Sequence, residues 1–69
     1  MSIERIIKIM LMDLSSDNLK LEEELEKVIN SDMEINEKTK SIKSILTNMV
    51  STDASIAKLT TMFSNNKTE

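Results

Sequence analysis

The sequence contains no cysteine and no histidine, which excludes disulfides and the common ligand sets of zinc sites. It also contains no glycine and no proline, whereas hairpin sheets usually need glycine or Asn-Gly at their tight turns. Phe63 is the one aromatic residue. Leu, Met, Lys and Glu are frequent, and these residues lose little rotamer freedom in a helix. The composition therefore predicts an all-α fold.

The same absences bear on catalysis. Without histidine or cysteine the familiar catalytic triads and dyads cannot be built, and without glycine there is no phosphate-cradling loop. The acidic run at residues 22–26 is typical of a solvated helix face. We therefore expect a non-enzymatic protein with no cofactor and no metal.

The charge balance limits the partners. Twelve acids against nine Lys and Arg give a net charge of -3, whereas nucleic-acid binding depends on clustered basic residues. We do not expect nucleic-acid binding. The longest apolar run, residues 9–12, is far shorter than the roughly 20 residues of a membrane span. The first residues include Glu4 and are followed by no small-residue cleavage site, so we expect a cytoplasmic protein.

Apolar residues recur every seven positions along most of the chain. This predicted core stripe consists of Ile7, Leu14, Leu21, Val28, Ile35, Ile42, Met49, Ile56 and Phe63. Further apolar residues flank it, three positions after a stripe residue at Met10, Ile45 and Leu59, and four positions after one at Leu11, Leu25 and Leu46. The stripe is thus wider than a two-stranded seam and is typical of a helix in a bundle.

Polar clusters predict where the helix is interrupted. Ser31 and Glu34 have the spacing of a capping box, with Ser31 as the N-cap of a second helix. Residues 15–18 and 51–53 are two further runs of weak helix formers, and either could be a kink or a short loop. We expect one helical domain over residues 1–63, either a hairpin with kinks or a set of three helices, and a disordered tail at 64–69, which has no apolar residue.

An antiparallel hairpin follows from folding the chain at Ser31. If the numbers of facing residues add up to 63, Leu21 meets Ile42 and the acidic run lies opposite Lys38, Lys40 and Lys43. Such charge pairs are weak but select orientation. Two long helices from two chains would give the same pairing. The hairpin is favoured because its turn is short.

The chain is small for a self-sufficient core, so we expect a homo-oligomer in a helical bundle or coiled coil. Ile6, Ile9 and Met12 point away from the predicted core stripe and are the candidate partner-binding residues. The expected function is a protein-binding accessory: an assembly chaperone, an adaptor or an inhibitor of a larger complex. High Ile, Asn and Lys with a single Arg is typical of AT-rich genomes, including those of phages. The alternatives are a structural oligomerisation module and an oligomer that binds nucleic acid or a nucleotide between subunits.

Overall fold

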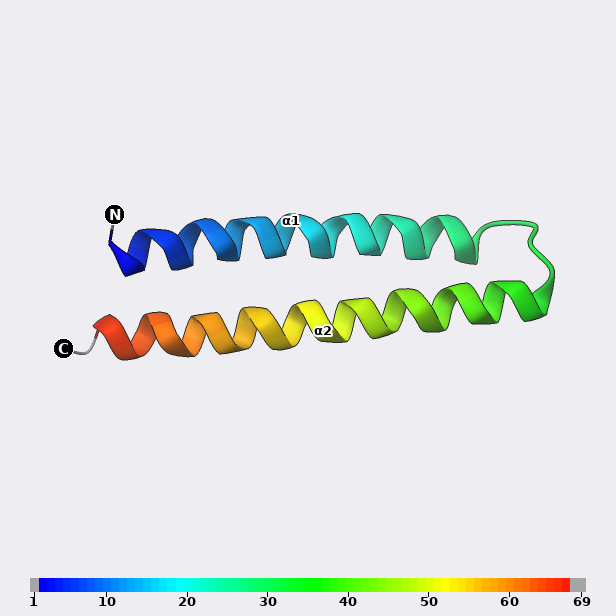
Figure 1. The fold of residues 1–69 in the computed structure, drawn as a ribbon. Helices are drawn as coiled ribbons and strands as arrows, with labels where there is room; N and C mark the ends of the chain where they lie inside the picture. Colours follow the sequence, from blue (N-terminus) through cyan, green and yellow to red (C-terminus); the bar gives the residue numbers. More distant parts are fainter. Residues whose placement is uncertain (1, 68–69) are drawn as a thin grey trace.

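The structure is a computed structural model that describes residues 2–67, and over that range it consists of two α-helices and no strand. Helix α1 spans Ile3–Ile29 and helix α2 spans Ile35–Lys67. The two helices lie side by side and run in opposite directions, with residues 30–34 as the connecting loop at one end and both termini at the other (Figure 1). The predicted all-α antiparallel hairpin is therefore confirmed.

The hairpin is a thin rod. It measures 53 × 15 × 13 Å, and its radius of gyration is 15.9 Å, whereas a compact domain of this length would have about 11 Å. Its accessible surface is 5399 Å², against about 4,400 Å² for a compact monomer of the same mass. Among the described residues, the buried apolar side chains are Ile7 and Ile45, at 2% and 8% exposure. Two helices alone therefore leave much apolar surface uncovered.

Each helix begins at a polar cap. The Ser2 hydroxyl accepts a hydrogen bond from Arg5 N at 3.3 Å at the start of α1. At the start of α2, Glu34 Oε2 accepts from the backbone N–H groups of Asn36 and Glu37 at 3.1 and 3.3 Å. These groups have no intrahelical acceptor, so the carboxylate satisfies them.

The predicted capping box is therefore wrong by three residues. Ser31 does not cap α2, because its hydroxyl donates to the carbonyl of Val28 at 2.6 Å and belongs to the end of α1. The Lys38 ammonium then donates to the carbonyl of Ile29 at 2.9 Å, which joins the start of α2 to the end of α1. A cation at a helix C-terminus also complements the helix dipole.

The two helices meet along one seam with alternating steps of four and three residues. The seam is formed by partly or fully buried residues: Ile7, Leu11, Leu14, Asn18, Leu21, Leu25 and Val28 from α1, and Lys38, Ile42, Ile45, Met49, Thr52, Ile56, Leu59 and Phe63 from α2. Eight of the nine predicted stripe residues lie in it. Ile35 does not, at 68% exposure, because it is the first residue of α2 and lies beyond the end of α1.

Two side-chain contacts define the register. Asn18 Nδ2 donates to Asp53 Oδ1 at 2.8 Å, and Lys8 Nζ lies 5.6 Å from the centre of the Phe63 ring. The residue numbers of both pairs add up to 71, so the predicted sum of 63 is wrong by eight residues, about one heptad. The reason is the loop: α2 begins at Ile35 rather than directly after Ser31.

This shift also changes the charge pairing. It aligns the acidic run with residues 45–49 of α2 and moves it past the lysines at 38–43 by about 12 Å, which is eight residues of helix. The charge pairing proposed from the sequence is therefore wrong, although the antiparallel direction is right.

Both helices continue through the polar runs that could have been kinks. Residues 15–18 lie within α1 and residues 51–53 lie within α2. The Thr52 hydroxyl donates to the carbonyl of Asn48, four residues earlier, so it is satisfied inside the helix. Helix α2 also extends to Lys67, so residues 64–67 of the predicted tail are helical. Adding a residue to an existing helix needs no new nucleus. Residues 68 and 69 lie outside the described range.

Candidate functional site: two apolar depressions near the open end

One side of the hairpin carries a groove between the two helices, which we call the interhelical groove. It has a volume of about 610 Å³ and is lined by Met10, Asp13 and Leu14 from α1 and by Ser51, Ala54, Ser55, Lys58 and Leu59 from α2. The α2 side chains Ser51, Ala54 and Ser55 are small and therefore leave this volume unfilled. The larger apolar lining residues are Met10, Leu14 and Leu59. The groove is thus apolar inside, with a shape that can accept a side-chain ridge of another helix.

The apolar surface continues from this groove toward the open end of the hairpin, which is the end opposite to the loop, where α1 begins and α2 ends. Ile3, Ile6 and Met10 follow one another at steps of three and four residues, and so do Ser55, Lys58 and Met62 on α2. Such steps place residues on one face of a helix. Ile3, Ile6, Met10 and Met62 are all exposed. Each helix therefore carries a second stripe beside the seam, which is apolar at Ile3, Ile6 and Met10 on α1 and at Met62 on α2.

Opposite charges flank the interhelical groove. Asp13 lies on the α1 wall and Lys58 on the α2 wall. Their numbers add up to 71, as do those of the Asn18–Asp53 and Lys8–Phe63 contacts, so the two charges lie at the same level along the rod. Neither side chain makes a hydrogen bond or an ion pair with another described residue. The groove thus offers one free anion and one free cation to whatever covers it.

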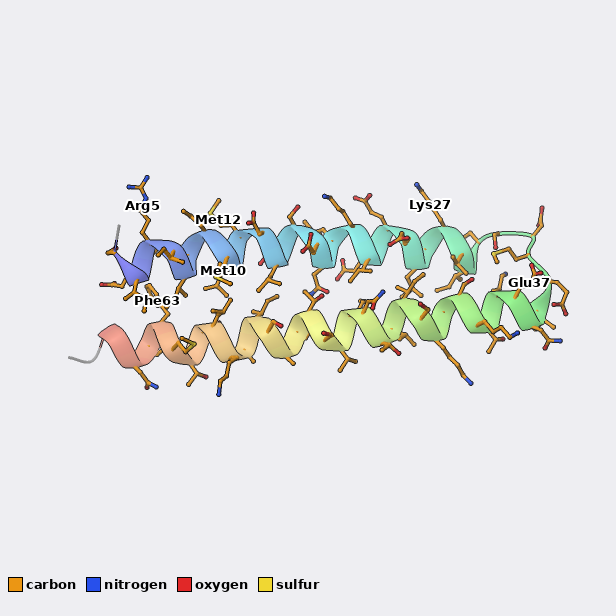
Figure 2. The ribbon with its side chains drawn as sticks, in the orientation of Figure 1. Arg5, Met10, Met12, Lys27, Glu37 and Phe63 are labelled. Atoms are coloured by element: carbon orange, nitrogen blue, oxygen red, sulfur yellow. The ribbon has the colours of Figure 1, made fainter. Side chains whose placement is uncertain are left out.

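The second depression lies on α1, away from this groove, and we call it the outer hollow. It has a volume of about 410 Å³ and is lined by Leu11, Met12, Ser15, Ser16 and Leu19. Met12 and Leu19 are seven residues apart and are 72% and 61% exposed. Figure 2 shows Met12 on the side of α1 that faces away from α2, whereas Met10 lies on the side that faces α2. The two small serines between the apolar side chains create the hollow.

The three residues predicted to bind a partner are all exposed, but they do not form one patch. Met12 lines the outer hollow, Ile6 lies on the stripe that extends the interhelical groove, and Ile9 lines neither depression. Sequence reasoning missed Leu19. Its spacing of seven from Met12 was the signal that could have found it. It also missed Asp13 and Lys58, because their common level depends on the register.

A polar contact interrupts the apolar seam. Asn18 occupies a seam position, and its amide nitrogen reaches Asp53 on the other helix. Its amide oxygen is buried and has no hydrogen-bond partner. A buried polar group of this kind lowers stability but favours one register over others. Asn18 therefore marks a position where helix alignment is specified.

Other kinds of site find little support in the described part of the chain. No group of three or more carboxylates there is placed to hold a metal ion. None of the described helices has a stretch that is both long and apolar enough to span a membrane. The depressions are lined by apolar, small and hydroxyl side chains with few charges, and such surfaces bind other apolar surfaces.

Comparison with known proteins yields no relative. No protein-family model matches the chain, and neither a curated protein nor a solved structure is significantly similar to it. The functional conclusion therefore depends on the geometry and chemistry described above.

Proposed function

We propose that this chain is a non-enzymatic protein-binding accessory, such as an assembly chaperone, an adaptor or an inhibitor of a larger complex, and that it acts by helix–helix packing. The observation that carries this proposal is the outer hollow. Met12 and Leu19 expose most of their surface on the side of α1 that α2 does not cover. Two large apolar side chains one heptad apart, with small residues between them, match an amphipathic helix laid along α1.

The chemistry of the partner helix follows from the surroundings of the outer hollow. Continuing along α1, the exposed surface becomes acidic at Glu22, Glu23 and Glu26. The partner proposed here is therefore an amphipathic helix of another protein, with apolar residues for the hollow and basic residues for the acidic run. The proposed setting is the cytoplasm, and the proposal includes self-association of the hairpin as part of its working form.

The test is affinity capture from the source cell with four forms of the protein. We expect wild type to capture a defined protein, and Met12→Gln with Leu19→Gln to lose it. Val50→Gln is the matched control, because Val50 is an exposed apolar residue of α2 that lines neither depression. Neutralising Glu22, Glu23 and Glu26 to Gln should weaken capture and its dependence on salt.

Two outcomes would count against this function. If the Met12→Gln, Leu19→Gln variant captures the same protein as wild type, the outer hollow is not the binding surface. If the variant instead loses its own oligomeric state, the outer hollow is a contact between copies. That result would favour the second candidate, a purely structural oligomerisation module, for which the large exposed surface of the single hairpin is the supporting observation.

A further inference from the structure

The interhelical groove and its charges point to a specific partner. We propose that a second copy of this chain covers the groove, so that two hairpins form a four-helix bundle with their open ends together and the two-fold axis parallel to the rod. This inference deepens the self-association included in the proposed function, because it names the surface, the partner and the orientation.

The first argument is the amount of surface to be covered. The hairpin exposes about 1,000 Å² more than a compact monomer of its mass. A standard protein interface buries about 800 Å² on each partner. The apolar surface of the groove begins in the seam at Leu14 and Leu59 and continues to the open end through Ile3, Ile6 and Met10 on α1 and Met62 on α2. Covering this face would pack each helix against two neighbouring helices, one from its own hairpin and one from the other copy, as in a four-helix bundle.

The second argument is the symmetry of the charges. In a two-fold interface, a contact from residue i to residue j of the partner is matched by a contact from j to i. With the axis parallel to the rod, α1 of one copy lies over α2 of the other at the same level. Asp13 and Lys58 lie at one level on opposite walls of the groove. Each would then face the opposite charge of the other copy, giving two identical ion pairs.

The third argument decides between two orientations of the second copy, with its open end beside the first open end or beside the first loop. Turning the second copy end for end would place the apolar open end over the loop half of the same face. That half carries polar residues at the same helical steps: Asp17, Lys20, Glu24 and Lys27 on α1, and Ser44 and Asn48 on α2. Apolar side chains would then be covered by charged and polar ones, and Asp13 would face α1 of the other copy rather than Lys58. The parallel axis matches apolar surface with apolar surface.

The test uses two charge variants of the full chain that should pair only with each other. Asp13→Lys places two cations at the groove, and Lys58→Asp places two anions there. We expect each variant alone to dimerise about tenfold more weakly than wild type, since two attractive pairs become repulsive and a tenfold change is about 1.4 kcal/mol. An equimolar mixture should dimerise as well as wild type. Native mass spectrometry at low salt should then show the mixed dimer in excess over either homodimer.

A pair of single substitutions distinguishes self-association through the interhelical groove from self-association through the outer hollow. Met10→Gln should weaken self-association measured by sedimentation equilibrium, whereas Met12→Gln should leave it unchanged. Helix content by circular dichroism verifies that each variant is folded. A mixture that dimerises no better than the separate variants would overturn the proposed orientation. Self-association that depends on Met12 but not on Met10 would overturn the proposed surface. A wild-type monomer at tens of micromolar would overturn the dimer while leaving partner capture through the outer hollow to be judged on its own test.

Discussion

Replacing Asn18 by leucine tests how the seam is stabilised and aligned. Asn18 is only partly exposed, its amide oxygen is buried without a partner, and its amide nitrogen donates to the exposed Asp53 at 2.8 Å. Leucine removes the unsatisfied oxygen, which costs about 1–3 kcal/mol when it is buried. It also adds apolar burial of about 1 kcal/mol for a half-covered side chain.

The stability lost with the Asn18–Asp53 hydrogen bond is smaller than the stability gained from the leucine. The hydrogen bond to a carboxylate contributes about 1.5 kcal/mol in a protein, but Asp53 is exposed and regains water when Asn18 is gone. We therefore expect Asn18→Leu to raise the free energy of unfolding by about 1 kcal/mol. In a domain of this size that change raises Tm by about 4–8 °C. The same substitution should relax the register, because a polar seam residue no longer penalises other alignments.

The assay is thermal and urea unfolding at one fixed protein concentration, since association makes Tm depend on concentration. Asp53→Ala is the control: it removes the acceptor and keeps the polar group in the seam, so it should destabilise the protein by about 1 kcal/mol. Register relaxation can be followed by pairing single cysteines placed on the two helices and counting which crosslinks form. An Asn18→Leu variant that is less stable than wild type, with one crosslink pattern, would refute this reasoning.

Two further predictions concern the register and the loop. Leu21→Ala and Met49→Ala should each cost about 1–3 kcal/mol, below the range for fully buried residues, and their double mutant should be non-additive. Leu21→Ala with Ile42→Ala should be additive in the same denaturant melts, and the reverse pattern would restore the register expected from the sequence. Glu34→Ala should destabilise by about 1 kcal/mol through loss of the α2 cap, measured by Tm, whereas Glu37→Ala, in the first turn of α2, should have a smaller effect. Equal effects of the two would argue against the cap.

The sequence by itself determined the class of fold. The lack of glycine and proline, the single aromatic residue and the frequent Leu, Met, Lys and Glu predict helices, and a seven-residue apolar repeat predicts that they pair along a stripe. The polar cluster after Val28 correctly located the turn. The exposure of Met12 could also be predicted, because its position on the helix depends only on the period of 3.6 residues.

The tertiary structure decided what the repeat leaves open. A stripe with a period of seven looks the same after a shift of seven residues, so it cannot distinguish the pairing of Leu21 with Ile42 from its pairing with the region of Met49. The loop makes that choice, because residues 30–34 and the Glu34 cap set where α2 begins. The register in turn decides which charges share a level. It separates the acidic run from the lysines at 38–43 and aligns Asp13 with Lys58, a juxtaposition of residues 45 positions apart that arises only when the two helices are packed.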